Sequence, residues 1–388
     1  MPEPIVVEKG LENVLLGESA ITLVAGETGG LVYRGFDITE LVPGTPYESV
    51  VHLLLFGEPP PEDPSERVRD ELSARRSLAR SVQAIADALP PRLPPLEAMR
   101  TLLSALGDGT SPYPPTVEGG FDLIARLPIL LARYVRRSQG LLPVDSRPDF
   151  GHVANYLWTL SGRPPAEAHV RALENYFVLL ADHGMNASTF ALRVVLSTHS
   201  DLISAATAAL GALKGPIHGG APSRVSDMLD SVGTPENSEL WVKNALERNE
   251  LLYGFGHRAY KVEDPRAILL KQIAREVAEP MRLELAETVE QAALNALHGR
   301  RPNARLFTNV EYYGAVVLEA VGLPRDLFTP TFAVARTAGW AAHALEQASD
   351  NRLIRPDVRY TGPPSGRKWP RRRIDPEPRR APGEAGSD

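Results

Sequence analysis

The spacing of apolar and polar residues predicts a mostly helical chain. Apolar residues recur every three or four positions in YESVVHLLLFG (47–57), SERVRDELSARRSLARSVQAIADAL (65–89) and LEAMRTLLSALG (96–107). This spacing places apolar side chains on one face of an α-helix. Prolines at 59–61, 90–91, 94–95 and 114–115 separate these stretches, because proline cannot donate to a helical hydrogen-bond ladder. The fold class is therefore expected to be mainly α.

One stretch near the N-terminus follows a different pattern. In ITLVAGETGGLVYRG (21–35), apolar and β-branched residues flank Glu27-Thr28-Gly29-Gly30. Two short apolar runs around a glycine-rich turn are typical of a β-hairpin. We expect a short hairpin before the helices.

Helix boundaries place several polar residues on loops. Lys214, Gly215 and Pro216 mark the end of an alanine-rich helix, and Ser223 is expected to cap the next one. His218 then lies on a short loop between two helices.

Two further helix starts are predicted from capping residues followed by proline. Asp264-Pro265 predicts a helix with Arg266 in its first turn, and Thr329-Pro330 predicts another. On the second helix Arg336, Trp340 and His343 share one face by their spacing.

Length and composition exclude several classes of protein. The 388 residues exceed the ~250–300 over which one hydrophobic core usually extends, so we expect two domains or a large and a small one. The net charge of −6 gives no general attraction for nucleic acid or anionic membranes. The absence of cysteine excludes disulfides and thiolate chemistry. No secretory signal or apolar run of ~18 residues is present, so the expected location is the cytoplasm.

Three motif matches do not support the chemistry that they suggest. GFGHRA fits a dinucleotide-binding pattern, but no strand precedes it and the next helix begins too late. HGGA at His218 is similar to an esterase oxyanion loop, but the chain has no G-x-S-x-G elbow. His343 and Glu346 are only two possible metal ligands, so no metal site is predicted.

Histidines beside glycine and a set of arginines remain as candidates. An isolated histidine is more often a structural hydrogen-bonding group, and an isolated arginine more often forms a surface ion pair. Glycine lets the backbone approach a ligand closely, and the arginine fork suits a carboxylate. The candidates are His183, His218, His257, Arg266, Arg336 and Arg355. Together they favour a small substrate with several carboxylates.

Taken together, these segments resemble the citrate synthase family, in its shorter bacterial and archaeal form. The matching text is GLENVLLGES, GGLVYRGFDITEL, DHGMNASTF, LKGPIHGG, GFGHRAYKVEDPRA, NVEYYGAVV, FTPTFAVARTAGWAAHALEQ and DNRLIRP. The resemblance implies a mainly helical homodimer in which a large and a small domain close over the substrates. The large domain would comprise 1–217 and 315–367 and the small domain 218–314. Residues 368–388, rich in Pro, Arg and Glu, are expected to form a disordered tail.

The resemblance also implies a reaction and the residues that perform it. The family condenses acetyl-CoA with oxaloacetate and hydrolyses citryl-CoA, with the coenzyme A thioester as a substrate and no further cofactor. His218 would donate a hydrogen bond to the thioester oxygen, His257 would polarise the ketone, and Glu311 would remove the methyl proton. His183, Arg266 and Arg336 would bind oxaloacetate, with Arg355 supplied by the other subunit.

A glycine loop resembles the family's coenzyme A site. The implied residues are Leu252, Gly254, Phe255, Gly256, Lys261 and Asn309. Lys261 could meet a phosphate as a point charge.

Two departures from the family pattern leave alternatives open. The family base is an aspartate in N-V-D, whereas this chain has Asn309-Val310-Glu311, which extends the carboxylate by about 1 Å. After HGG the family usually has Ala-Asn, and this chain has Ala221-Pro222. The alternatives are a 2-methylcitrate synthase that uses propionyl-CoA, or a weakly active or non-catalytic member that binds oxaloacetate or coenzyme A.

Overall fold

The computed structural model describes residues 9–11, 14–61, 65–107, 109, 113–219, 222–300 and 304–365, and helices dominate them. The mainly α fold class is confirmed. The helices in this part of the chain are α1 (Ile38–Leu41), α2 (Tyr47–Phe56), α3 (Ser65–Ala74), α4 (Arg80–Ala88), α5 (Pro95–Ser104), α6 (Val117–Ser138), α7 (His152–Ser161), α8 (Glu167–Leu180), α9 (Ala187–Ser197), α10 (Leu202–Leu213), α11 (Pro222–Val232), α12 (Ser238–Glu247), α13 (Pro265–Val277), α14 (Pro280–Arg300), α15 (Val310–Ala320) and α16 (Phe328–Ser349). Short 3₁₀ turns are η1 (Lys9–Leu11), η2 (Pro235–Asn237) and η3 (Arg325–Leu327).

The chain divides into two units. Residues Leu16–Ile354 form one compact unit, and the two chain ends, Met1–Leu15 and Arg355–Asp388, are grouped separately. The expected boundaries between a large and a small domain, at 218 and 314, both fall within this compact unit. The division into these two domains stays a prediction. The expected disordered tail, 368–388, lies outside the described residues.

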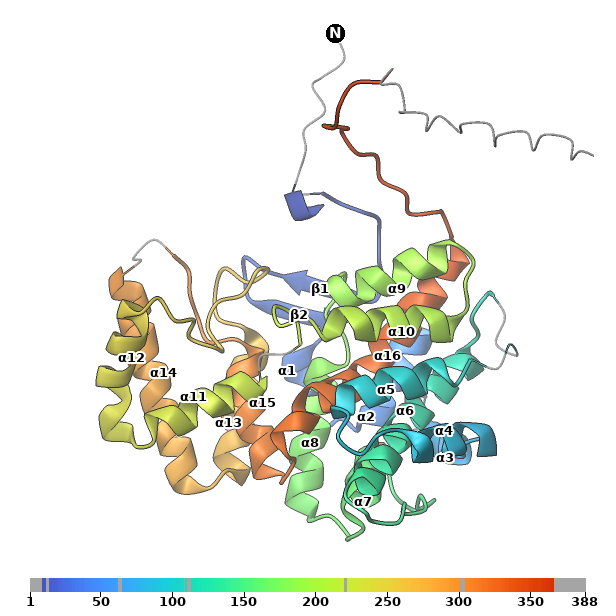
Figure 1. Cartoon of the computed structure of the whole chain (residues 1–388), viewed down its shortest axis with the longest axis horizontal. Helices are drawn as coiled ribbons and strands as arrows, with labels where there is room; N and C mark the ends of the chain where they lie inside the picture. Colours follow the sequence, from blue (N-terminus) through green and yellow to red (C-terminus); the bar gives the residue numbers. More distant parts are fainter. Residues whose placement is uncertain are drawn as a thin grey trace, which may run out of the picture. The chain divides into compact units, whose positions relative to one another are not determined.

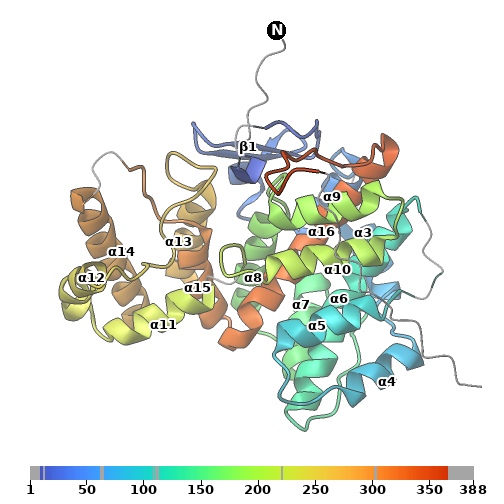
Figure 2. The ribbon, with the colours of Figure 1, turned by 45° about the horizontal axis from the view of Figure 1, so that its top comes forward.

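Helix α16 runs through the core of the compact unit. It packs against α2, α6, α8, α9 and α10, and its residues are buried almost continuously from Phe328 to Ala344. A helix enclosed on all sides needs small and apolar residues around its whole circumference, which AVARTAGWAAHA supplies. Figures 1 and 2 show α11–α14 gathered at one end of this unit, with α15 and α16 leading toward the remaining helices.

The N-terminal sheet has one strand more than the predicted hairpin. Strands β1 (Thr22–Ala25) and β2 (Gly30–Tyr33) pair antiparallel, and β3 (Phe36–Asp37) pairs with β2. Gly30 pairs with Ala25 and so belongs to a strand, leaving Gly26–Gly29 as the turn. Two residues are too short for a periodic pattern, which is why β3 was missed.

Three predicted helix boundaries are wrong. The stretch 65–89 forms two helices, α3 and α4, because the chain unwinds between Ala74 and Arg80. Helix α11 begins at Pro222, so Ser223 lies inside it and does not precede it. Helix α16 begins at Phe328, and the Thr329 hydroxyl donates to the Gly219 carbonyl oxygen at 2.8 Å instead of capping.

Candidate active site

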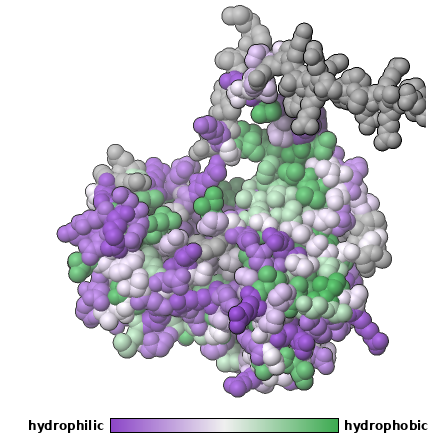
Figure 3. Space-filling model, viewed as in Figure 1, coloured by the Kyte–Doolittle hydropathy of each residue, from purple (hydrophilic) through white to green (hydrophobic). Residues whose placement is uncertain are grey.

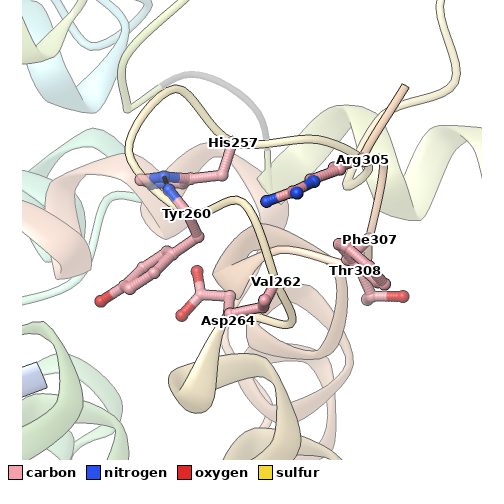
Figure 4. A pocket seen from close by; sticks show the side chains of 7 residues that line it. All are labelled: His257, Tyr260, Val262, Asp264, Arg305, Phe307 and Thr308. Carbon is pink, nitrogen blue, oxygen red and sulfur yellow. Dashed lines mark hydrogen bonds between the residues drawn. The ribbon is translucent and has the colours of Figure 1, made fainter. Parts of the chain in front are cut away.

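The loop that carries His257 is held against the segment before α15. Gly256 N–H donates to the Phe307 carbonyl oxygen at 2.7 Å, and Asn309 N–H donates to the Gly254 carbonyl oxygen at 2.9 Å. Gly254 has a φ of +87°, and a Cβ there would lie 2.7 Å from the Tyr312 ring. Only glycine combines this backbone angle with so close an approach. Figure 4 shows Arg305, from the strand-like segment before α15, extending toward His257.

The His257 ring has a defined tautomer. Its Nδ1 accepts the N–H groups of Ala259 at 3.0 Å and Tyr260 at 3.2 Å. An imidazole nitrogen that accepts carries no proton, so the neutral ring is protonated at Nε2. Burial, with the Arg266 charge adding to it, lowers the pKa of His257 to about 4. The ring is therefore neutral at pH 7 and offers one N–H.

Arg266 faces the same space as the free edge of His257. Its Nη2 lies 3.4 Å from His257 Nε2 as a second donor beside it, since both atoms carry protons, and the side chain is buried. Asp264 orients it through two contacts, Nε to Oδ1 at 3.0 Å and Nη2 to Oδ2 at 2.8 Å. Asp264 also caps α13 through Arg266 N–H, as predicted, and accepts Val310 N–H at 3.2 Å. One carboxylate thus fixes the arginine and the first turns of α13 and α15.

Glu311 lies in the first turn of α15. Asn309 caps this helix by accepting Glu311 N–H at 3.0 Å, and its side-chain amide donates to the Gly256 carbonyl oxygen at 2.9 Å. Burial raises the pKa of Glu311 to about 7, although Arg266 and Arg336 oppose the shift. No side chain of the described residues hydrogen-bonds to its carboxylate. The group is a carboxyl poised to exchange a proton near neutral pH.

His218 is held by the start of α9. Its Nε2 accepts Ser188 N–H at 3.2 Å and lies 3.0 Å from the Ser188 hydroxyl oxygen. The neutral ring therefore carries its proton on Nδ1. Burial, followed by repulsion from Arg336, lowers the pKa of His218 to about 4. The positive end of the α9 dipole also favours the neutral form.

Arg336 is a buried cation that forms no ion pair within the part of the chain that the structure describes. Its Nε donates to the Leu180 carbonyl oxygen at 2.6 Å, and its guanidinium lies 4.7 Å from the centre of the Phe332 ring. It is 1% exposed, and no carboxylate of the described residues lies within ion-pair distance. Burial lowers its pKa. A desolvated guanidinium of this kind favours an anionic ligand.

His183 connects the groups into one site. Its Nε2 lies 3.2 Å from the Tyr260 hydroxyl, and its ring centre is 5.3 Å from that of His257. Burial lowers its pKa well below the usual value, and the nearby groups Arg266, His257, Arg336 and His218 lower it further. The structure therefore brings together six of the predicted residues: His183, His218, His257, Arg266, Glu311 and Arg336.

The other predicted residues differ in their surroundings. The side chain of Leu252 is buried in the core, whereas Lys261 is exposed and held through its N–H by the Gly26 carbonyl oxygen at 2.8 Å. Phe255 forms a bridge to Thr308. Arg355 belongs to the terminal unit, where it pairs with Asp357 at 3.5 Å.

Sequence reasoning missed residues that orient the predicted ones. Ser188 holds His218, Asp264 holds Arg266, and Tyr260 contacts His183. Asp264 was recognised only as a cap, although its position two residues before Arg266 could have indicated an ion pair. His343 and Glu346, rejected as metal ligands, both contact Arg193. Within the described residues, no group of three or more His, Asp or Glu could hold a metal ion.

Known proteins match this sequence over nearly its whole length. The family profile described as citrate synthase, C-terminal domain, matches residues 10–357. The chain is 40% identical to a citrate synthase of Haloferax volcanii over 92% of this chain and 96% of the relative. It is 35% identical to 2-methylcitrate synthase 2 of Corynebacterium glutamicum over 92% and 95%. None of the described helices is both long and apolar enough to cross a membrane.

Solved structures agree with the sequence relatives. The crystal structure of citrate synthase from Thermotoga maritima superimposes with a TM-score of 0.84 at 35% identity, covering 94% of this chain and 98% of that one. The Thermoplasma acidophilum citrate synthase, solved with carboxymethyl coenzyme A and oxaloacetate, gives a TM-score of 0.87 at 27% identity over 94% and 98%. With the family profile and close relatives matching nearly the whole chain, this protein is a member of the citrate synthase family.

Proposed function

We propose that this chain condenses acetyl-CoA with oxaloacetate and hydrolyses the resulting citryl-CoA to citrate and coenzyme A. The observation that carries the proposal is the buried guanidinium of Arg336, which has no carboxylate partner among the described residues and lies near Arg266 and three neutral imidazoles. Two guanidinium groups suit the two carboxylates of a dicarboxylate. Neutral imidazole rings can donate hydrogen bonds to a carbonyl oxygen, and they are too weakly acidic to protonate a nearby base.

Each group has a role that matches its geometry. The Glu311 carboxylate takes a proton from the acetyl methyl group while His218 Nδ1–H donates to the thioester oxygen. The enol carbon then attacks the keto carbon of oxaloacetate, whose oxygen accepts a hydrogen bond from His257 Nε2–H. This oxygen becomes the hydroxyl of citryl-CoA by taking up one proton, which balances the proton that Glu311 removed. Water finally adds to the thioester carbonyl and the coenzyme A thiol leaves. A base and a donor acting together lower the enolisation barrier more than either alone.

Binding roles follow from exposure and charge. Arg266, Arg336 and His183 would hold the oxaloacetate carboxylates and keto group. The loop of Gly254, Phe255 and Gly256, fastened by Asn309, leaves the exposed Lys261 available for a coenzyme A phosphate. Leu252 would support this loop from the core, since its side chain is buried.

The activity is tested by release of coenzyme A thiol from acetyl-CoA and oxaloacetate. Because the chain has no cysteine, a thiol reagent reports only the product. Parallel reactions contain propionyl-CoA or lack oxaloacetate. Faster release from acetyl-CoA supports the proposal, and preference for propionyl-CoA would replace it with 2-methylcitrate synthesis. Failure of both substrates, with oxaloacetate binding retained by calorimetry, would indicate a non-catalytic member.

A homodimer would complete the site. Figure 3 shows apolar residues gathered over α9 and α10, where Phe190, Val194, Val195, Ala208 and Ala212 are partly exposed. Partly exposed apolar side chains on two adjacent helices suit contact with a second copy. Arg355 of the partner subunit would then supply a third guanidinium to oxaloacetate.

If each active site takes Arg355 from the other subunit, two inactive variants should restore activity to each other in a mixed dimer. Arg355→Ala and Glu311→Ala are coexpressed with different tags, and the doubly tagged dimer is purified. One of its two sites should be intact, giving roughly half the wild-type activity per dimer. If Arg355 acted within its own subunit, both sites of the mixed dimer would carry a lesion and activity would stay low.

A further inference from the structure

Helix α16 contacts the segment before His183 at successive turns. Arg336 Nε donates to the Leu180 carbonyl oxygen at 2.6 Å, and Gly339 N–H donates to the Ala181 carbonyl oxygen at 3.1 Å. A Cβ at Gly339 would lie 2.4 Å from both the Ala181 oxygen and Asp182 Oδ1. The third contact is from His343 to Asp182, at 3.2 Å between Nε2 and Oδ2.

Asp182 fixes the backbone on both sides of His183. Its Oδ2 accepts Gly184 N–H at 2.8 Å, and its carbonyl oxygen accepts the Tyr33 hydroxyl at 2.9 Å. Gly184 has a φ of +57°. The Asp182 carboxylate thus closes a tight turn whose central residue is His183.

The hydrogen bonds that lead to Asp182 run in one direction, from Arg193 as donor to His343 and from His343 as donor to Asp182. Arg193 has only donors, and its Nη2 and Nε lie 2.6 Å and 3.2 Å from His343 Nδ1. His343 Nδ1 must therefore accept, which leaves the ring proton on Nε2 to be donated to Asp182. The same Arg193 Nη2 also donates to Glu346, whose carboxylate accepts Ala20 N–H at 2.8 Å.

The carboxylate at the end of this chain of hydrogen bonds is ionised and enclosed. Asp182 and His343 are fully buried. Burial alone would raise the pKa of Asp182, but the hydrogen bond from His343 and the charge of Arg336 lower it. Asp182 Oδ1 has no hydrogen-bond partner among the described residues. A buried carboxylate with so few donors is strongly affected by the loss of one.

We propose that Arg193 and His343 are positioning residues, which orient His183 toward oxaloacetate through the Asp182 carboxylate. The inference rests on the proposed function, because it assigns His183 to oxaloacetate binding. His343 touches neither substrate. It acts by keeping the 182–184 turn in one conformation, with His183 facing His257 and Tyr260.

Two substitutions at one position separate positioning from packing. His343→Leu removes the donor to Asp182, and His343→Gln retains an amide donor that can take its place. We expect His343→Leu to raise the Kd for oxaloacetate, measured by calorimetry on the full chain, roughly tenfold or more. His343→Gln should restore most of the affinity, and the KM for acetyl-CoA should change little in either variant.

Tyr156→Phe is the matched control. It removes another fully buried hydrogen bond to α16, between the hydroxyl groups of Tyr156 and Thr331 at 2.7 Å, away from the 182–184 turn. It should lower the melting temperature without changing the Kd for oxaloacetate. A nitrogen NMR spectrum of histidine-labelled wild type adds a direct readout, since His343 should be protonated at Nε2 only.

The outcomes are distinct. Equal oxaloacetate affinity in wild type and His343→Leu would overturn the positioning role while leaving the proposed function intact. Equal weakening of oxaloacetate and acetyl-CoA binding would also overturn it, because it would indicate general loosening. Wild type that binds no oxaloacetate would overturn the proposed function and this inference with it.

Discussion

Glu311 combines a helix N-terminus, which favours a negative charge, with burial, which disfavours one. Burial wins, since the pKa of its carboxyl is raised to about 7. A base with this pKa still ionises readily near neutral pH and binds a proton more strongly than an ordinary carboxylate does. The residue is therefore suited to removing a weakly acidic proton from a thioester methyl group.

Substitutions at Glu311 test its assignment as the base. Glu311→Ala should lower kcat by about 100-fold or more and leave the Kd for oxaloacetate nearly unchanged, because Arg266 and Arg336 remain. Glu311→Asp should also lower kcat, since Asn309 fixes the start of α15 and the shorter side chain withdraws the carboxylate by about 1 Å. Steady-state kinetics and calorimetry measure both.

The alanine and aspartate variants of Glu311 would contradict different parts of this assignment. Full activity in Glu311→Ala would show that another group removes the proton. Higher activity in Glu311→Asp would show that the site is still built for aspartate and that the glutamate is a compromise.

At the scale of elements, the turn of the N-terminal hairpin supports the loop that carries His257. The Gly26 carbonyl oxygen accepts Lys261 N–H at 2.8 Å, and a Cβ at Gly26 would lie 2.2 Å from the Ala259 oxygen. Ala259 N–H is itself one of the two donors to His257 Nδ1. Displacing Ala259 would therefore disturb the ring that we propose polarises the oxaloacetate ketone.

Gly26→Ala is expected to raise the KM for oxaloacetate several-fold by pushing the 259–261 segment outward. Gly17→Ala makes the same chemical change where no atom lies within 4 Å, and should leave the KM unchanged. Measuring both variants under identical conditions isolates the contact with Ala259. An unchanged KM in Gly26→Ala would show that the loop yields without moving His257.

The elements also show which features could be predicted from sequence. The cap at Asp264-Pro265 is local, so sequence located both the start of α13 and Arg266. The bonds from Ser188 to His218 and from His343 to Asp182 join residues 30 and 161 positions apart. No periodic pattern encodes such pairs. Glycine loops and arginines suggested the histidines and arginines as candidates, only the resemblance to a family added Glu311, and the residues that support them were missed.

For the whole molecule, stability in acid depends on buried histidines outside the site as well as within it. His152 is buried between α2 and α8, stacked on Tyr47 at 5.5 Å, and its Nε2 has no partner among the described residues. Burial, with the Arg76 charge adding to it, lowers its pKa to about 3. The unfolded chain binds this proton at a higher pH than the folded chain does, so acid favours unfolding.

His152→Phe should make stability less dependent on pH. In wild type, the contribution of His152 is complete above pH 6.5 and is lost as pH falls toward 3, on the order of 2 kcal/mol between pH 7 and pH 5. The variant keeps an aromatic ring but cannot take up a proton. Denaturant unfolding at both pH values measures the difference, and equal pH dependence in both proteins would contradict the assignment.

The bond from Arg336 to Leu180 joins residues 156 positions apart. Such a pair can form only after most of the intervening chain has collapsed, and closing long loops slows folding. During renaturation, helix content measured by circular dichroism should therefore recover before catalytic activity. Recovery of catalytic activity would therefore measure completion of folding. A chain that has regained its helices but not this contact would be inactive toward its substrates.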